Sequence, residues 1–385
     1  MIKTSVNRLC IYVTYNIEKI IYKYMEEVLR SLKECCTKVY LVCNYEKRDS
    51  ELKYTVPYVN NIFYRPNKGY DSGAFQDILC NLLGWEEVYR YDELVLVNDS
   101  FFGFFYPLEN TFDLMENADC DFWGMTGQKA GEYLNPTYPF EAHIHSYFMT
   151  FKRNILKSKA FRTFWEQFPY PATFREAITN FELGINSHLK KYGFQGKSYI
   201  DIYNLDLQRN ENPCYGRLYE LVHDYKVPVM KKKCVLVRNT GFSSTLKTIE
   251  YLKKEKRYHT EWITSFLENQ FYIPGIGDTP CNSLEIFYRT HSDIYIYGAG
   301  VCGRNLEIYF DYKRWKFQGF LVTDNSASDK YIMNIGEVEI HEDTGIIIAV
   351  INDKAAKEIA ENIGNRCKKE QLFFLSECNA IRMPN

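Results

Sequence analysis

The sequence lacks the cysteine spacings that mark zinc sites and disulfide frameworks. Its 12 cysteines are scattered over 385 residues, and no C-x-x-C pair occurs. This distribution argues against structural zinc, which needs closely spaced pairs of ligands. Free thiols are typical of a reducing compartment, so we expect a cytoplasmic protein.

Long apolar runs are also missing. No stretch approaches the roughly 20 apolar residues that a membrane-spanning helix requires. Residues 1–9 are polar and mixed, so we expect no signal peptide.

The sequence has no excess of basic charge either. Its formal net charge is -2, with 46% apolar and 25% charged residues. This balance is that of an ordinary soluble globular protein, and it argues against nucleic acid as a partner. The length suffices for two or three domains, and we find no internal repeat or low-complexity segment.

Aromatic residues, by contrast, are abundant, with 32 Tyr and 26 Phe. One interpretation is a nucleotide bias of the gene combined with core packing. The other is that some rings line a carbohydrate or nucleobase site, where flat faces stack. Composition alone leaves both open.

Residues 67–100 combine three features of a ligand site. They begin with a Gly-rich turn at 67–73, continue with a helical pattern, and end with the apolar run Leu94–Val97. That run is typical of a buried strand, and it stops at Asn98-Asp99-Ser100. Because open α/β sheets bind ligands at the carboxyl ends of their strands, we expect a site there.

Strand and helix patterns alternate through the first hundred residues. Apolar runs predict strands at 9–13, 38–43 and 61–64, and an apolar stripe predicts a helix over about 17–32. This order indicates an α/β fold with a doubly wound, mostly parallel sheet. Further segments follow: strands at 119–126 and 145–152, helices at 161–168 and 180–192, and a helix with a strand in 213–237.

A second, smaller Rossmann-like α/β unit is expected near the C-terminus. After a strand, Gly298, Gly300 and Gly303 open a helix at the spacing of a dinucleotide-binding turn, where a pyrophosphate would bind. Asp324 follows the next strand, where an acid would meet a ribose. An empty structural unit is the alternative. A charged helical connector separates the two units, which divides the chain into 1–244, 245–290 and 291–385.

The order of parts in residues 1–244 resembles a GT-A glycosyltransferase. The matching pieces are Thr14-Tyr15-Asn16 after the first strand, Asn67-Lys68-Gly69 in the turn, and Asn98-Asp99-Ser100 after the later strand. Five motifs, RPNKGYDSGAF, LVLVNDSFFG, DFWGMT, HIHSYFMTF and FELG, more closely resemble the rhamnan synthesis protein F family over roughly residues 9–233. The C-terminal unit resembles the nucleotide-binding domain at the front of capsule-pathway sugar acyltransferases.

The family resemblance implies a glycosyltransferase. Such an enzyme would move a sugar, here expected to be rhamnose, from a nucleotide-sugar donor to a growing bacterial surface polysaccharide. The acceptor is expected to be lipid-linked, which implies peripheral contact with the inner face of the membrane. The rivals are an oxidoreductase or epimerase acting through residues 298–324, and a non-catalytic sugar-nucleotide-binding subunit.

The resemblance also assigns donor-binding residues. Asp99 is the expected ligand of Mg²⁺ or Mn²⁺, although Asn98 and Ser100 replace the second acid of Asp-x-Asp; its alternative role is to cap the turn. Asp71 would bind the base or ribose, or cap a helix. The remaining donor residues are expected from position: Thr14 and Tyr15 at the nucleobase, and Asn67, Gly69 and Gly73 in a turn that lets the backbone approach the donor.

The expected catalytic base is Glu182, which would take a proton from the acceptor hydroxyl; alternatively, it stabilises the helix dipole. Several other residues have two interpretations each. His143, His145 and Ser146 contact the acceptor or donor sugar, or are satisfied polar groups. Trp123 and Gly124 line the sugar pocket or belong to the core. His223 and Lys231 to Lys233 meet phosphate or are solvated.

Overall fold

The computed structural model describes residues 6–15, 21–46, 56–134, 137–208, 210–273, 282–323 and 331–378. The chain divides into two compact units, Met1–Lys232 with Lys256–Tyr258, and Lys233–Glu255 with His259–Asn385. In this division the helical segment after residue 232 belongs to the C-terminal unit. The division of the chain into 1–244, 245–290 and 291–385 stays a prediction.

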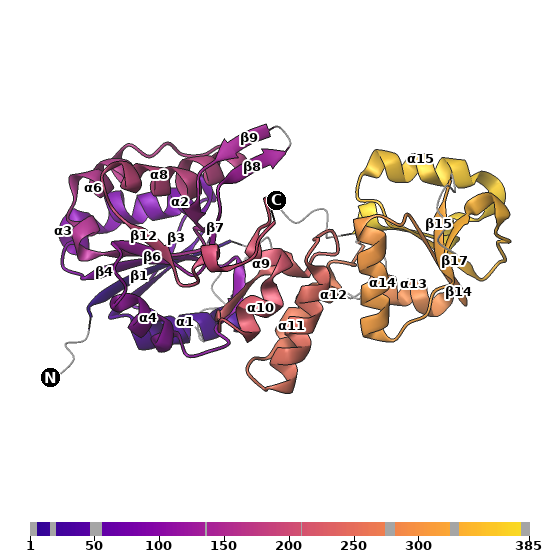
Figure 1. Cartoon of the computed structure of the whole chain (residues 1–385), viewed down its shortest axis with the longest axis horizontal. Helices are drawn as coiled ribbons and strands as arrows, with labels where there is room; N and C mark the ends of the chain where they lie inside the picture. The colour runs from indigo at the N-terminus through magenta and orange to yellow at the C-terminus, as the bar shows by residue number, and fades with distance from the viewer. Residues whose placement is uncertain are drawn as a thin grey trace. The chain divides into compact units, whose positions relative to one another are not determined.

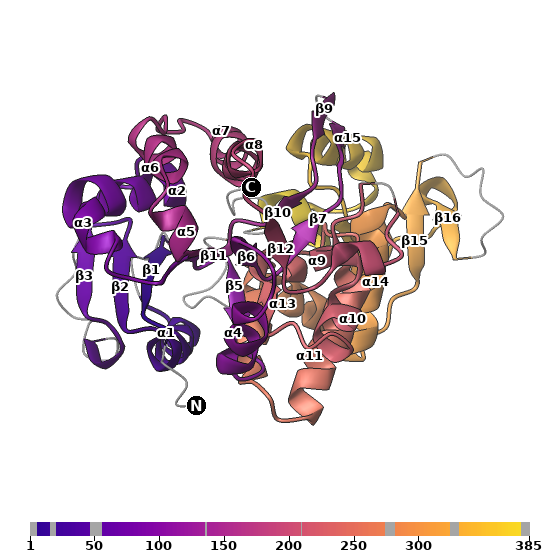
Figure 2. The same cartoon turned by 60° about the vertical axis from the view of Figure 1, so that its left-hand side comes forward.

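A seven-stranded sheet forms the centre of the first unit, in the order β12-β6-β11-β4-β1-β2-β3. All its neighbours pair in parallel except β11, which is antiparallel to both β4 and β6. Figure 2 shows β1, β2 and β3 side by side. The strands are β1 Arg8–Thr14, β2 Lys38–Cys43, β3 Asn61–Tyr64, β4 Glu93–Asn98, β6 Phe122–Gly124, β11 Phe148–Lys152 and β12 Gly196–Ser198.

Helices cover both faces of this sheet (Figure 1). Successive residues of β1 enter different cores because side chains alternate along a strand: Tyr12 packs on one face, and Ile11 and Val13 pack on the other. The face of Tyr12 is covered by α1 Lys23–Cys35 and α4 Leu108–Glu116. The opposite face is covered by α2 Tyr70–Gln76, α3 Trp85–Val88, α5 Arg153–Leu156, α6 Lys159–Glu166 and α8 Gly184–Lys191.

Short ribbons and helical turns complete the first unit. β5 Phe101–Gly103 pairs with β13 Val229–Lys231, and β7 Gly127–Gln128 pairs with β10 His143–Ile144. β8 Gly131–Leu134 pairs with β9 Thr137–Phe140. The remaining elements are α7 Phe174–Ala177, α9 Pro213–Gly216, α10 Leu218–His223, the π-helical turns Asp77–Leu83 and Ile178–Leu183, and the 3-10 turns Val56–Tyr58 and Ile202–Asn204.

The second unit contains a five-stranded, wholly parallel sheet in the order β16-β15-β14-β17-β18. The predicted fold class is therefore confirmed: an α/β chain with a large, mostly parallel sheet and a second, smaller parallel sheet. Its elements are α11 Phe242–Lys254, α12 Thr260–Asn269, α13 Ser283–Thr290, β14 Asp293–Tyr297, α14 Val301–Lys313, β15 Gly319–Val322, β16 Ile332–Asn334, β17 Thr344–Ile348, α15 Asp353–Ile363 and β18 Leu372–Phe374.

Predicted and observed bounds differ for several elements; the strand expected at 119–126, for example, covers only Phe122–Gly124. Three further differences matter for the site. The helix expected from about residue 17 begins at Lys23, and its predicted residues 17–20 lie outside the described part. The strand expected from residue 145 begins at Phe148 because the chain turns at Ser146 and Tyr147. The third lies around Glu182: α7, the π-helical turn and α8 follow one another without a break, so Glu182 lies within this helical run and not in its first turn. No described helix is long and apolar enough to cross a membrane.

Candidate functional site

The carboxyl ends of β1 and β4 meet the start of β11 on the side of the sheet where the parallel strands end. We call this side the strand edge. The amide of Asp99 donates to the carbonyl of Val13 (3.1 Å), and the amide of Asn98 donates to the carbonyl of Tyr147 (3.1 Å). Because β11 runs antiparallel, the residues before it lie at the edge where the parallel strands end. Thr14, the Asn98–Ser100 segment and Ser146 are thereby collected at the edge where such sheets bind ligands.

Asp99 is engaged by a hydroxyl and an ammonium group. The Thr14 Oγ1 donates to Asp99 Oδ2 (2.7 Å), and Lys232 Nζ lies 3.5 Å from the same oxygen. The side chains of Lys232 and Asp99 are 16% and 14% exposed, so this ion pair is largely shielded from water. Asp99 therefore belongs to a charged pair at the strand end and does more than cap a turn.

Asn98 links Ser100 to Asp71. Its Nδ2 donates to Asp71 Oδ2 (2.6 Å), while its Oδ1 accepts from the amide (3.1 Å) and hydroxyl (2.6 Å) of Ser100. The other oxygen of Asp71 accepts from the Ser72 amide (2.9 Å). Burial raises the pKa of Asp71 more than these hydrogen bonds lower it. The N-cap of α2 is Gly69, so the capping alternative for Asp71 is not what the structure shows.

These residues do not fit the divalent metal expected at Asp99. A hard cation needs several oxygen ligands, but Asp99 is one carboxylate that already faces a lysine. The oxygens of Asn98 and Asp71 are occupied by donors of the protein. Among the described residues, no group of three or more His, Cys, Asp or Glu is placed to hold a metal ion.

The Gly-rich turn needs its glycines for its own packing. Gly69 has φ +69°, a conformation that side chains rarely adopt, and a Cβ there would lie 2.7 Å from Tyr170 Cδ1. At Gly73 a Cβ would lie 2.7 Å from the carbonyl oxygen of Lys68. A cavity of about 450 Å³ lies beside the turn, lined by residues 67–70 and 170–172. The turn therefore packs against Tyr170 and leaves room for a ligand next to it.

Two side chains that precede the turn hold its backbone. Asn44 Nδ2 donates to Asn67 Oδ1 (3.3 Å) and to the carbonyl of Tyr70 (3.1 Å). Arg65 donates to Asn44 Oδ1 (2.8 Å) and to the carbonyl of Lys68 (2.8 Å). Sequence reasoning missed these two residues and Tyr170. Arg65 could have been found from the sequence, because it is the first residue of the motif RPNKGYDSGAF. No pattern in the neighbouring sequence indicates Tyr170.

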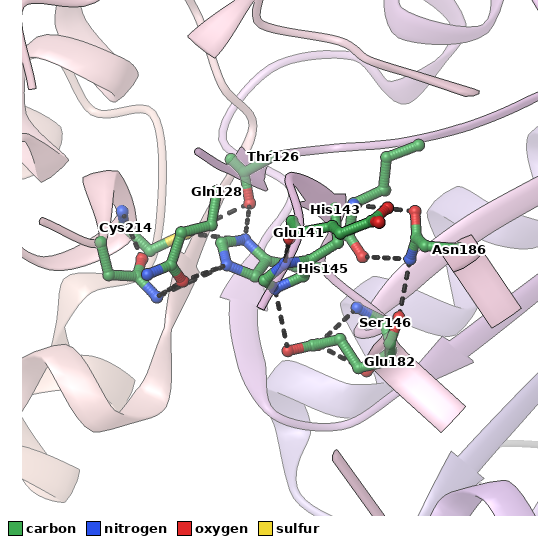
Figure 3. Close-up of polar contacts among 11 residues, drawn as sticks. Thr126, Gln128, Glu141, His143, His145, Ser146, Glu182, Asn186 and Cys214 are labelled. Carbon is green, nitrogen blue, oxygen red and sulfur yellow. Dashed lines mark hydrogen bonds and ion pairs between the residues drawn. The ribbon is translucent and has the colours of Figure 1, made fainter. Parts of the chain in front are cut away.

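Glu182 is held by the chain segment that enters β11 (Figure 3). Its Oε2 accepts from the amide (2.7 Å) and the hydroxyl (2.8 Å) of Ser146. Its Oε1 lies 3.8 Å from His143 Nε2. The Nδ1 of His143 donates to the carbonyl of Glu141 (2.9 Å), and its buried Nε2 has no hydrogen-bond partner in the described part of the chain. Asn186 Nδ2 donates to the backbone carbonyls of both Ile144 and Glu182, which links the two segments.

The surroundings of Glu182 keep it ionised. Burial alone would raise its pKa, but His145, Lys231 and His143, together with the Ser146 amide, lower it to about 2. The negative charge of Glu182 also raises the pKa of Asp71, so Glu182 interacts electrostatically with the strand edge. The expected base is thus a carboxylate at neutral pH, with one oxygen anchored by Ser146.

His145 lies in the interior and not in a ligand cavity. It is 1% exposed, and its Nδ1 lies 2.9 Å from Thr126 Oγ1. Its Nε2 lies near the side-chain amides of Gln128 (3.5 Å) and Asn212 (3.4 Å), as Figure 3 shows for Gln128. Burial lowers the pKa of His145 to about 3, so the ring is neutral at pH 7. The expected contact between His145 and the donor is therefore replaced by a role inside the fold.

The core interpretation holds for Trp123 as well. Its side chain is 0% exposed and packs edge-on against Phe112 and beside Phe148. A Cβ at the neighbouring Gly124 would lie 2.4 Å from Ile144 Cγ2. The side chain of Trp123 does not line a pocket, because it packs in the apolar core on the same face of the sheet as Tyr12.

The other predicted residues are dispersed. Tyr15 follows β1 and is 44% exposed, while Asn16 lies outside the described residues. His223 lies on α10, where its Nδ1 is 2.7 Å from Asp224 Oδ1. Of the lysine run, Lys232 reaches Asp99, and Lys231 Nζ lies 5.0 Å from the centre of the Tyr147 ring.

In the second unit, backbone conformation accounts for Gly298 and packing accounts for Gly303. Gly298 has φ +103°, and a Cβ at Gly303 would lie 1.9 Å from the carbonyl oxygen of Gly298. A Cβ at Gly300 would meet nothing within 4 Å. Asp324 lies outside the described residues. Nucleotide binding at this turn stays a prediction.

The fold and site are those of an α/β protein with a polar, charged strand edge. The family model of rhamnan synthesis protein F matches residues 39–274, which is more than half of the chain. The chain therefore belongs to the rhamnan synthesis protein F family. This membership supports a transferase that uses sugar nucleotides.

Individual relatives are distant. The uncharacterized protein y4gN of Sinorhizobium fredii is 24% identical over 174 residues, which are 44% of this chain and 43% of that protein. The chain thus matches less than half the length of that curated relative. A cytidylyltransferase from Leptospira borgpetersenii aligns with a TM-score of 0.32 at 13% identity, over 69% of this chain and 98% of that one. Core-mannan synthase A from Aspergillus fumigatus, in a Mn/GDP form, aligns with a TM-score of 0.25 at 10% identity, over 43% and 64%.

Proposed function

We propose that this protein is a glycosyltransferase that moves a sugar from a nucleotide-sugar donor to a growing bacterial surface glycan. Family membership supports the class of enzyme. The observation that carries the proposal is the strand edge, where the Thr14–Asp99–Lys232 cluster adjoins the hydrogen-bonded pair Asn98–Asp71. The charge of the ionised Glu182 acts on Asp71 at the same edge. Rhamnose as the sugar and a lipid-linked acceptor are part of the proposal.

The proposed transfer breaks the bond between the sugar C1 and the diphosphate oxygen. The bonding electron pair leaves with the nucleoside diphosphate, and the acceptor hydroxyl oxygen forms the new bond to C1. The hydroxyl proton passes to Glu182, whose Oε1 is not held by Ser146. An ionised carboxylate can accept this proton as the hydroxyl becomes acidic in the transition state.

The donor is proposed to lie across the ends of β1 and β4. Thr14 and Tyr15 would face the nucleobase, and the cavity beside the turn at 67–70 offers room for part of the ligand. Asp71 would bind the ribose or base, as its place beside Asn98 allows. A lipid-linked acceptor would bring the protein to the inner face of the membrane, and we propose the cytoplasm as its compartment.

The first experiment screens donors with the intact protein. We expect one or more UDP-, dTDP- or GDP-sugars to raise its melting temperature, because a ligand that binds only the folded state stabilises it. The same donor should then be hydrolysed slowly by the pure protein, with water replacing the acceptor.

Two outcomes separate the rival functions. Stabilisation by NAD(H) alone would contradict the transferase and favour an oxidoreductase acting through Gly300. Tight binding of a nucleotide sugar without hydrolysis, and without transfer to a lipid-linked glycan fraction, would favour the non-catalytic subunit.

A further inference from the structure

Lys232 occupies the position at the strand edge where the sequence led us to expect a metal ion. Its Nζ lies 3.5 Å from Asp99 Oδ2, the oxygen that also accepts from Thr14. The side chain is 16% exposed, so the ammonium group is partly withdrawn from water yet still reachable from the surface. A positive charge is therefore already present beside the carboxylate that was expected to bind a cation.

The fold holds this lysine firmly in place. β13 pairs with β5, and the Lys232 amide donates to the carbonyl of Ser100 (2.8 Å). Lys232 Nζ also lies 4.8 Å from the centre of the Tyr24 ring, within the range of a cation–π contact. Backbone pairing thus fixes the lysine to the residue that directly follows Asp99 in sequence.

Lys231 points to the other side of the same backbone. Its Nζ lies 5.0 Å from the centre of the Tyr147 ring, and its charge lowers the pKa of both Glu182 and His145. The two adjacent lysines therefore act on different carboxylates. Lys231 lowers the pKa of Glu182, and Lys232 forms an ion pair with Asp99. The divergence falls where the strand ends, because β13 stops at Lys231 and a 3-10 turn, Lys232–Val235, begins at the next residue.

A departing nucleoside diphosphate needs a nearby positive charge. The charge on its phosphate oxygens grows as the bond to the sugar breaks, and fixed cations in a shielded site stabilise that growth strongly. The described residues lack a cluster that would hold a divalent metal here, whereas a lysine can contact phosphate directly as a point charge.

We propose that Lys232 supplies the positive charge that stabilises the leaving diphosphate, so that transfer proceeds without a divalent metal ion. This inference rests on the glycosyltransferase function proposed above. Asp99 is then a positioning residue, which orients the Lys232 ammonium group together with Thr14. The step balances as in the proposed transfer: the sugar–oxygen bond breaks and its electron pair stays on the phosphate beside Lys232, while the acceptor oxygen bonds to C1 and its proton passes to Glu182.

The experiment uses the intact protein and the donor that the screen identifies. Donor hydrolysis is measured after dialysis against EDTA, and again with added Mg²⁺ or Mn²⁺. The variants are Lys232→Met, Lys232→Arg and, as a matched control, Lys190→Met, whose side chain is 70% exposed at the end of α8. Binding of the nucleoside diphosphate is compared with binding of the corresponding nucleoside, to separate loss of the phosphate contact from loss of the fold.

We expect hydrolysis to persist in EDTA and to fall about 100- to 1,000-fold in Lys232→Met, the usual loss when a fixed group that stabilises transition-state charge is removed. Lys232→Met should weaken binding of the diphosphate and leave binding of the nucleoside unchanged. Lys232→Arg should keep part of the activity because the charge remains, and Lys190→Met should keep all of it.

Two results would overturn the inference, and they differ in what else they overturn. If EDTA abolishes hydrolysis, Mn²⁺ restores it and Lys232→Met stays active, the enzyme uses a metal and only the role of Lys232 is wrong. If the unmodified protein neither binds nor hydrolyses any nucleotide sugar, the proposed function fails together with the inference.

Discussion

Glu182 remains ionised in a mostly buried position because hydrogen-bond donors and positive charge surround it. Ser146 donates two hydrogen bonds to one oxygen, and Lys231 contributes its charge from β13. Since His145 is neutral at pH 7, the charge of Lys231 and the amide of Ser146 are among the groups that still lower the pKa of Glu182 at working pH. Glu182 is thus in the deprotonated form that a base requires at any pH near neutrality.

Replacing Glu182 by Gln tests its role as the base. We expect transfer to fall by about 100- to 10,000-fold, the usual contribution of a positioned general base, while nucleotide affinity stays unchanged. The control is Glu34→Gln on α1, whose side chain is 63% exposed. It also removes one negative charge, and we expect it to leave the rate of transfer unchanged. Transfer at the original rate in Glu182→Gln would remove this residue from the mechanism.

The buried His145 predicts how stability depends on pH. The folded protein takes up a proton on His145 only near pH 3, whereas the unfolded chain does so near the ordinary value of 6.5. The unfolded state therefore binds more protons below pH 6.5, and the free energy of unfolding falls as the pH drops. Between about pH 7.5 and 5.5 this linkage amounts to about 1 kcal/mol.

Urea denaturation at the two pH values measures this effect. His145→Gln should flatten the pH dependence, whatever its absolute stability, because the titrating group is gone. His223→Gln, with a side chain 41% exposed, should retain the slope of the unmodified protein. An unchanged slope in His145→Gln would show that His145 does not cause it.

Among the elements, the Gly-rich turn has a sequence that both backbone conformation and packing constrain. Gly69 and Gly193 both have positive φ, +69° and +85°, but only Gly69 has a neighbour, Tyr170, where a Cβ would be. We expect Gly193→Ala to cost about 1 kcal/mol and Gly69→Ala about 2 to 4 kcal/mol, because the second adds overpacking to backbone strain.

Thermal or urea unfolding of the two variants separates the cost of backbone strain from the cost of overpacking against Tyr170. Equal losses would show that the Tyr170 ring moves aside at no cost. In that case the glycine at position 69 reflects backbone conformation alone.

The elements that sequence patterns predicted well are those with continuous apolar runs. β1, β2, β3 and β4 agree with the predicted strands to within about a residue at each end, because a buried parallel strand must be apolar throughout. β5, β7 and β10 were not predicted. They are two or three residues long, and their pairing depends on distant partners, as β5 depends on Val229 to Lys231.

At the scale of the whole molecule, the predicted fold class is confirmed, because the chain has a large, mostly parallel sheet and a second, smaller parallel sheet. The candidate site was predicted only in part. Asp99, Asn98 and Asp71 could be placed together because they lie in one motif-rich stretch, and their role in binding a donor stays a prediction. The burial of Trp123 and His145 could not be read, because sequence does not show which face of a strand or turn is inward. Lys232 was considered for phosphate binding, but its pairing with Asp99 spans more than a hundred residues and could not be read from spacing.

The central claim is that a nucleotide sugar binds at the ends of β1 and β4 in the first unit. A crystal structure with the nucleoside diphosphate of the preferred donor tests it most directly. We predict the diphosphate within hydrogen-bonding distance of Lys232, with the base toward Thr14 and Tyr15. A nucleotide bound instead at the Gly300 turn before α14, with the Asp99–Lys232 pair untouched, would contradict the account.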